Sequence, residues 1–179
     1  MKGWFLKAVL AAASLGLSYI VPAASGSAQD NGAADPPYMP DLRLADGSGL
    51  PFNLSRYKGA VIVLEFWSTS CGPCLRDLDA LNHLQGDFPG KPLMVFAVNE
   101  DPVSIQQVKA AMARQKLNFL RPFADPQGAA AQSLNLRGLP TSFIVDRMGR
   151  MVFEVEGPQP WNGAALEKRI NFLLSQTPQ

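Results

Sequence analysis

The stretch that decides the fold is FWSTSCGPCLRDL, residues 66 to 78, which holds the only two cysteines of the chain, Cys71 and Cys74. The run AVIVLEFW, residues 60 to 67, leads into it and is hydrophobic on both faces, which is typical of a central strand covered by helices. After the cysteines, leucines recur at helical spacing and predict a helix over residues 72 to 85. The cysteine pair therefore lies where a buried strand passes through a short loop into a helix.

The rest of the chain continues this alternation of strands and helices. We expect further strands at residues 92 to 98, 141 to 146 and 151 to 156, and further helices at about residues 103 to 115, 128 to 134 and 162 to 174. Residues 41 to 57 predict a β-hairpin, and the stretch around FLRPFADP, residues 119 to 126, looks irregular. This order predicts an α/β fold with a central mixed, mostly parallel sheet, helices on both faces and an N-terminal β-hairpin extension.

The N-terminus has the pattern of an export signal. Residues 1 to 28 combine a short basic start, an uncharged apolar run at residues 8 to 21 and a small-residue cleavage site. An uncleaved membrane anchor remains an alternative, since roughly 20 apolar residues span a bilayer. Residues 29 to 40 predict a flexible linker, which leaves residues 41 to 179 as the folded domain. In both cases we expect a periplasmic or otherwise extracytoplasmic domain, where disulfide chemistry is permitted.

Composition supports one globular domain and excludes a nucleic-acid partner. The chain has 179 residues, of which 47% are hydrophobic and 17% are charged, as expected for a protein with a packed core. Its formal net charge is +1, and it is −1 without residues 1 to 28, which carry two lysines and no acid. A nearly neutral domain offers no basic surface for nucleic acid or for a membrane.

The cysteine pair could be a structural disulfide, part of a metal site or a redox-active pair, and the first two interpretations have weak support. A structural disulfide that closes so small a loop stabilises the fold by only about 2 kcal/mol before strain is subtracted. A structural zinc site needs four Cys or His ligands, and the chain adds only His83 to the two cysteines, so a metal would have to bridge two copies. Leu75 follows Cys74 where a haem-attachment pattern needs histidine.

The interpretation that Cys71 and Cys74 are a redox-active pair has positive physical support. The unpaired N–H groups and the dipole at a helix N-terminus favour negative charge, and this stabilises a thiolate at Cys71. Cys74 lies one turn inside the helix and is expected to be more buried. Cys71 would then attack a substrate disulfide, and Cys74 would resolve the mixed disulfide. Pro73 fits the first helical turn, where no N–H is needed.

These residues resemble the thioredoxin superfamily, and within it the exported TlpA/ResA-type thiol–disulfide oxidoreductases. The resemblance depends on F-W-x-x-x-C-G-P-C after a strand, on P-D-L-x-L-x-D-G-x-G at residues 40 to 49, and on G-L-P-T-S-F-I-V-D-x-x-G-R at residues 138 to 150. It covers about residues 38 to 175. The implied fold is thioredoxin-like, and the implied activity is dithiol–disulfide exchange between Cys71 and Cys74, the redox-active pair.

The resemblance also implies a surface that binds the substrate. In relatives the proline at the position of Pro140 is cis and lies against the cysteine pair; an ordinary trans proline before a strand is the alternative. The backbone of Leu139 would pair with an extended client segment by strand addition. Trp67, Gly72 and Pro73 would complete this surface.

An acid within the strand is the further catalytic candidate. Glu65 lies six residues before Cys71, where thioredoxins carry a buried acid that exchanges protons with the second cysteine. Burial raises the pKa of such a carboxyl group, so Glu65 could deprotonate Cys74. Pairing with a basic residue such as Lys58 is the structural alternative. Asp77 matches a position where TlpA/ResA-type proteins often carry Glu, or it is a solvated helix residue.

Some positions depart from the family pattern. Ser70 stands where many thioredoxins have tryptophan, and Asp79 replaces a helix proline, so substrate choice and helix shape are expected to differ. Thr141-Ser142 after Pro140 replaces the Glu-Thr of the cytochrome-c-maturation branch, which weakens the case for an apocytochrome client without removing it. Maturation of a cytochrome or a copper protein remains a compatible setting.

Gly72-Pro73 between the cysteines resembles the reducing members of the superfamily, so we expect a protein disulfide reductase. Its partners would be disulfide-containing exported client proteins and a membrane electron-donor thiol–disulfide protein. No G-x-G-x-x-G opens a helix, so we expect no nucleotide cofactor. The chain has too few Cys and His residues for a metal site, so we expect no metal either. One alternative is a thiol peroxidase, but Leu64 and Ser68 occupy the proline and threonine positions of its Pro-x-x-x-Thr-x-x-Cys motif. The other is a non-catalytic module that binds metal or protein.

Overall fold

The structure is a computed structural model that describes residues 35 to 47 and 51 to 177. They belong to the unit Asp35–Gln179, which is distinct from the unit Met1–Ala34. The expected signal peptide or anchor and the first part of the expected linker lie outside the described residues. Among the described helices, none is long and apolar enough to cross a membrane.

The described end of the expected linker, residues 35 to 40, is attached to the folded domain. Tyr38 forms an isolated antiparallel β-bridge with Arg150. The N–H of Met151 donates to the carbonyl oxygen of Pro37 at 2.7 Å. The folded unit therefore begins earlier than the sequence indicated.

Strands and helices follow one another in the predicted order. The strands are β1 (Leu44–Ala45), β2 (Pro51–Phe52), β3 (Val61–Trp67), β4 (Leu93–Asn99), β5 (Arg121–Ala124), β6 (Thr141–Val145) and β7 (Met151–Glu156). The helices are the 3₁₀ helix η1 (Leu54–Tyr57) and the α-helices α1 (Gly72–Asp87), α2 (Ile105–Arg114), α3 (Ala129–Ser133) and α4 (Ala164–Ser175). Strand β5 lies in the stretch that looked irregular, and η1 occupies the last four residues of the predicted hairpin.

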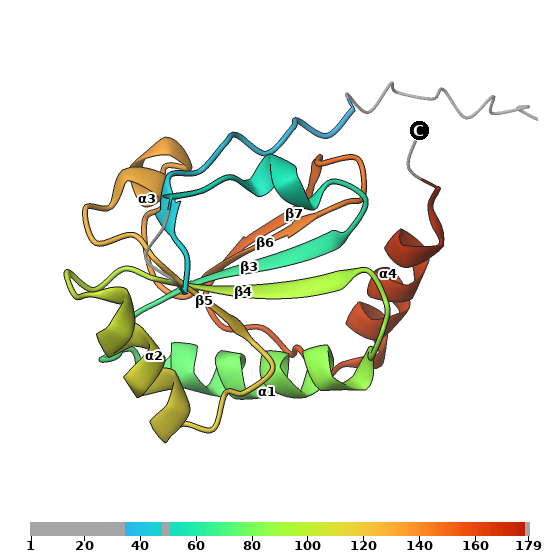
Figure 1. The fold of residues 1–179 in the computed structure, drawn as a ribbon. Helices are drawn as coiled ribbons and strands as arrows, with labels where there is room; N and C mark the ends of the chain where they lie inside the picture. Colours follow the sequence, from blue (N-terminus) through green and yellow to red (C-terminus); the bar gives the residue numbers. More distant parts are fainter. Residues whose placement is uncertain (1–34, 48–50, 178–179) are drawn as a thin grey trace, which may run out of the picture. The chain divides into compact units, whose positions relative to one another are not determined.

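The strands form one mixed sheet in the order β2-β1-β5-β4-β3-β6-β7 (Figure 1). Strand β3 pairs in parallel with β4, and β4 pairs in parallel with β5. The pairs β1–β2, β1–β5, β3–β6 and β6–β7 are antiparallel. The mixed sheet and the N-terminal hairpin are confirmed. The expectation of mostly parallel pairing is wrong, because β6 runs against β3 and parallel pairing is limited to β3, β4 and β5.

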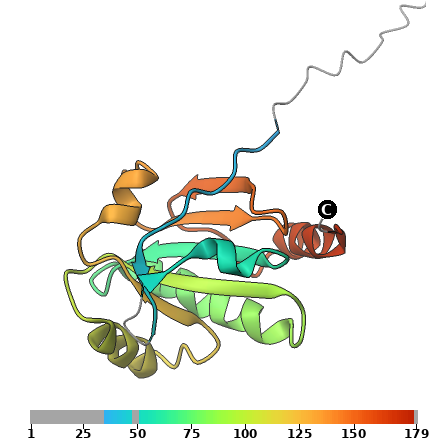
Figure 2. The same cartoon turned by 45° about the horizontal axis from the view of Figure 1, so that its top comes forward.

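Helices cover both faces of the sheet, as predicted (Figures 1 and 2). The first core cluster packs Val61, Val63 and Trp67 of β3 against buried side chains of α1, α2 and α4. The second cluster packs Ile62 and Leu64 of the same strand against the N-terminal segment, η1 and α3. Alternate residues of β3 thus enter opposite cores, which is why this strand is hydrophobic on both faces and fully buried.

Candidate active site

The two cysteines form a disulfide at the N-terminus of α1, with their Cα atoms 5.2 Å apart. Cys71 is the N-cap residue, and its sulfur accepts the backbone N–H of Cys74 at 3.2 Å. Pro73 lies in the first turn, where its missing N–H costs no hydrogen bond. The N–H that points at Cys71 would also stabilise a thiolate there once the disulfide is reduced.

The two sulfurs differ in exposure. Cys71 is half-buried and Gly72 and Pro73 are exposed, whereas Cys74 has 0% of its surface exposed. An attacking group can therefore reach Cys71 and not Cys74. The predicted asymmetry of burial within the pair is confirmed.

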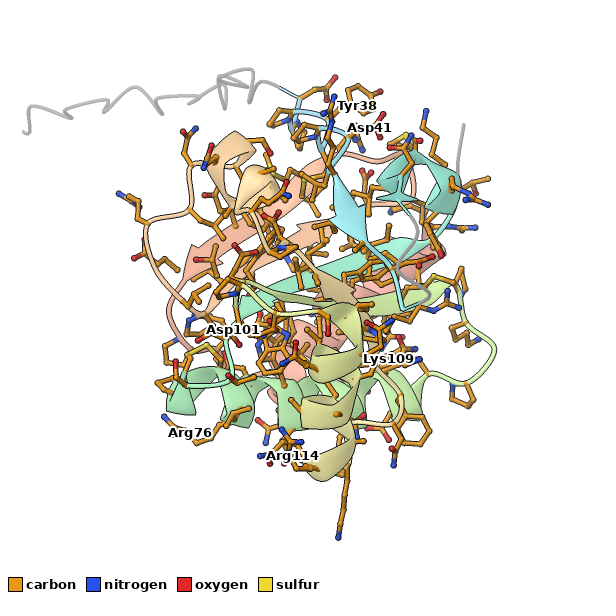
Figure 3. All side chains as sticks on the ribbon, turned by 60° about the vertical axis from the view of Figure 1, so that its left-hand side comes forward. Tyr38, Asp41, Arg76, Asp101, Lys109 and Arg114 are labelled. Atoms are coloured by element: carbon orange, nitrogen blue, oxygen red, sulfur yellow. A yellow bond between two sulfur atoms is a disulfide. The ribbon has the colours of Figure 1, made fainter. Side chains whose placement is uncertain are left out.

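The loop before Cys71 is fixed by Asp101, a residue that the sequence analysis did not single out. The Asp101 carboxylate accepts the backbone N–H of Thr69 at 2.8 Å and the side-chain amide of Asn99 at 3.0 Å. The carbonyl oxygen of Trp67 accepts the N–H of Glu100 at 2.9 Å. Figure 3 shows Asp101 at the edge of the sheet near the end of α1 that carries Arg76. The end of β4 thus positions the loop that presents Cys71.

Hydrogen bonds also control the charge of Asp101. Burial acts to raise its pKa, but the N–H of Thr69 and the amide of Asn99 outweigh this effect and lower the pKa below the usual range. Asp101 is therefore ionised at neutral pH. An ionised acceptor makes the stronger hydrogen bonds that a fixed loop requires.

Glu65 lies on β3, on the same face as Trp67, and its side chain is completely buried. Its Oε2 accepts the hydroxyl of Ser142, while its Oε1 is buried and has no hydrogen-bond partner among the described residues. Burial raises the pKa of Glu65 well above its usual range; the Ser142 hydrogen bond opposes this, and the nearby Asp77 carboxyl adds to it. The described ion pairs do not include Glu65, so pairing with Lys58 is not what keeps it in the core.

Asp77 is buried on α1, so it is not the solvated helix residue that the sequence left as an alternative. Its Oδ2 accepts the backbone N–H of Gln159 at 2.9 Å, which joins α1 to the segment before α4. Burial raises the pKa of Asp77, and the Gln159 hydrogen bond, Trp161 and Arg76 lower it in part. Asp77 and Glu65 are therefore two acids that share the interior beside Cys74.

The peptide bond between Leu139 and Pro140 is cis, as expected. Thr141 pairs with Phe66, so Pro140 comes at the level of Trp67, where β3 leads into the cysteine loop. Neither the N–H nor the carbonyl oxygen of Leu139 takes part in a backbone hydrogen bond within the described ranges. The backbone of Leu139 therefore has free groups for an added strand.

Trp67 does not contribute directly to the exposed surface. Only 1% of its surface is exposed, and it packs in the first core cluster with Cys74 and Leu78. The residues of the expected substrate surface that a client can reach are therefore Gly72, Pro73 and the half-buried Leu139.

One more acid near this edge has an unusual environment. Burial raises the pKa of Glu100 to about 8, and the charges of Asp125 and Asp101 contribute to the rise. One carboxyl oxygen of Glu100 is buried without a hydrogen-bond partner in the part of the chain that the structure describes. A weak signal for this group is present in the sequence, because three acids follow the carboxyl ends of the adjacent parallel strands β4 and β5.

Comparison with known proteins agrees with this site. The Redoxin family matches residues 33–170. The chain belongs to this family. It is 31% identical over 121 residues to the thiol-disulfide oxidoreductase ResA of Bacillus thuringiensis, which covers 67% of this chain and 68% of that protein. It is 31% identical over 125 residues to the thioredoxin-like protein YneN of Bacillus subtilis, which covers 69% of this chain and 72% of that protein.

A solved structure has the same fold. A crystal structure from Chlorobium tepidum, named as a thiol:disulfide interchange protein DsbE, aligns with a TM-score of 0.70 and 30% identity over 79% of this chain and 99% of that one. The protein is therefore a ResA/TlpA-type member of the thioredoxin superfamily with a thioredoxin-like fold. It is a thiol–disulfide oxidoreductase, and enzymes of this kind act on proteins that carry disulfide bonds.

Proposed function

We propose that this oxidoreductase works as a reductase of disulfide bonds in exported client proteins, with Cys71 as the nucleophile and Cys74 as the resolving thiol. The observation that carries this assignment is the difference in access: Cys71 is half-buried at the helix N-cap, and Cys74 is fully buried one turn inside. Only Cys71 can meet a client sulfur, and only Cys74 is held close enough to release the client afterwards.

The reaction proceeds in two exchanges. The Cys71 thiolate attacks one sulfur of the client disulfide, and the other client sulfur leaves with the electron pair. Cys74 then loses its proton and attacks the Cys71 sulfur, and the second client sulfur leaves as a thiolate. The client disulfide gains two electrons, and the enzyme is left with the Cys71–Cys74 disulfide present in this structure.

Glu65 is the proposed proton acceptor for Cys74. A carboxyl group whose pKa is raised by burial is a better proton acceptor for a thiol, and it can return the proton afterwards. Glu65 shares the face of the sheet on which Cys74 packs, and no basic residue neutralises it through a described ion pair.

Client binding is proposed to use the free backbone groups of Leu139 beside the cis peptide bond. An extended client segment would add there as a strand, with the exposed Gly72-Pro73 turn on the other side of its disulfide. Backbone recognition of this kind depends little on the side chains of the client.

The oxidised enzyme must be reduced again, so we propose a membrane thiol–disulfide protein as electron donor. The location that fits is the periplasm or another extracytoplasmic compartment, with residues 1–28 as a cleaved signal peptide or an anchor. The pattern of those residues supports export.

The test is to trap the clients. A Cys74→Ser variant should accumulate mixed disulfides with client proteins in the cell envelope, because the resolving thiol is missing, and the wild-type protein should reduce insulin disulfides in vitro. Cys71→Ser is the matched control and should trap nothing. Intact insulin with the reduced wild-type protein, or peroxide consumption by Cys74→Ser in place of trapped clients, would replace this function with that of a peroxidase or a binding module.

A further inference from the structure

Ser142 lies directly opposite Glu65 in the antiparallel pairing of β3 with β6. Its hydroxyl donates to Oε2 of Glu65 at 2.5 Å, and both side chains are fully buried. A serine hydroxyl has one hydrogen to donate, so it serves only one of the two carboxyl oxygens. The other oxygen, Oε1, is buried and has no hydrogen-bond partner among the described residues.

The unpartnered oxygen belongs to the interior that contains the resolving thiol. Side chains alternate between the two faces of a strand, so Glu65 lies on the face of Val63 and Trp67. Ser142 lies on the same face as Ile144, which packs in the same core cluster. Cys74 is a member of that cluster too. The carboxyl group therefore has one oxygen held by β6 and one left free in the core that α1 covers.

We propose that Ser142 is a positioning residue, which holds Oε2 of Glu65 so that Oε1 is the oxygen that exchanges a proton with Cys74. The inference rests on the proposed function, in which Glu65 serves this thiol. Ser142 thereby takes part in the reaction, and the two carboxyl oxygens of Glu65 have different roles.

Glu65 and Cys74 exchange the same proton in both directions of the reaction. When a donor thiolate attacks Cys71, the bond between the two enzyme sulfurs breaks, and the electron pair leaves on the Cys74 sulfur, which takes the proton from Oε1. The Ser142 hydroxyl then stabilises the carboxylate that remains. When a client is reduced, the Cys74 thiol returns its proton to Oε1, and its thiolate attacks Cys71 and displaces the client sulfur.

The surroundings leave few other groups for this role. On β4, the residue paired with Glu65 is Ala97, which carries no titratable group. From α1, the titratable neighbours are Cys74 itself and Asp77, and Asp77 is already held by the N–H of Gln159. The residues that α4 buries in this core are isoleucine and leucine. The hydrogen bond from Ser142 lowers the pKa of Glu65, so it stabilises the charged form of this carboxyl group.

The reaction of the reduced protein with dithiobis(nitrobenzoic acid) separates the two steps. Cys71 releases the first thionitrobenzoate when it forms the mixed disulfide, and Cys74 releases the second when it closes the enzyme disulfide. Ser142→Ala should slow the second release about tenfold at a pH below the Glu65 midpoint, because loss of a hydrogen bond to the charged acceptor lowers the carboxylate fraction. The midpoint of the second phase should move to higher pH, and the first release should be unchanged.

Two further comparisons make the outcome decisive. Ser142→Thr keeps the hydroxyl, and the valine of Ser142→Val has the shape of threonine without the hydroxyl. Ser142→Thr should therefore preserve the wild-type pH profile, and Ser142→Val should behave like Ser142→Ala. Glu65→Gln should slow the second release about 100-fold. In the Glu65→Gln background, Ser142→Ala should slow this release no further. A second phase that is normal in Glu65→Gln would remove the proton role of Glu65 itself. A second phase that is slow in Glu65→Gln and normal in both Ser142→Ala and Ser142→Val would overturn only the role of Ser142.

Discussion

Replacing Asp101 tests whether the end of β4 fixes the loop before Cys71. Asp101→Ala removes two hydrogen bonds to a charged acceptor, from the Thr69 N–H at 2.8 Å and from the Asn99 amide at 3.0 Å. Each such bond contributes about 1.5 to 3 kcal/mol, and the lower value applies because the site is partly exposed. The free energy of unfolding should therefore fall by about 3 kcal/mol.

Urea denaturation measures this loss. With a slope of about 2 kcal/mol per molar urea, the midpoint should fall by about 1.5 M. Asp101→Asn keeps an oxygen that can accept both donors and loses only the charge, so it should cost about half as much. The Thr69 amide should exchange its hydrogen faster in Asp101→Ala, and the thiol of Cys71 should react more slowly because its loop is less ordered.

The control is Asp79→Ala, which removes an exposed acid on α1 that has no described hydrogen bond or ion pair. It should change the free energy of unfolding by no more than about 0.5 kcal/mol. Equal losses in Asp101→Ala and Asp79→Ala, or unchanged hydrogen exchange at Thr69, would show that Asp101 does not fix the loop.

Two other predictions concern titration. In the reduced protein, Cys71 should react with iodoacetamide well below pH 8 while Cys74 does not, as measured by mass spectrometry of the labelled peptides; equal rates would contradict the assigned roles. The pKa of Glu100 rises from 4.5 to about 8 on folding, through burial and the charges of Asp125 and Asp101. Ionisation of Glu100 therefore lowers the free energy of unfolding. This loss of stability is absent below pH 4.5 and grows as the pH rises to 8. Glu100→Gln should thus match the wild type near pH 4 and exceed its stability by on the order of 1 kcal/mol at pH 8 after allowance for solvent screening; parallel stability curves would count against this.

The sequence was sufficient to predict the strand, loop and helix that carry the cysteines, because the signals there are local. The apolar run of β3 and the leucine spacing of α1 are read from neighbouring residues, and the access to each cysteine follows from its distance to the helix start. The direction of β6 was not predictable in this way, since hydrophobicity is the same whichever way a strand runs. Strand β5 was missed because Pro122 interrupts its sequence pattern. The structure tolerates this proline because β1 pairs with β5 only at Ala45 and Ala124, so few N–H groups of β5 are needed on the side that faces β1.

The site was predicted in part for a related reason. Glu65 stands out as an acid in an apolar run, but its partner Ser142 is 77 residues away, and Asp101 is 32 residues from Thr69. Only the sheet brings these pairs together. Their residue types are ordinary at a strand end or within a strand, so no local pattern marks them.

The bridge between Tyr38 and Arg150 has a consequence for how the enzyme can be attached to a surface. It lies by the turn between β6 and β7, at the end of the sheet where β3 begins, since Ile62 pairs with Val145. Cys71 follows the opposite end of β3, roughly 20 Å away for a strand of this length. A label or tether attached at Tyr38 itself would therefore sit at the end of the sheet remote from the sulfurs.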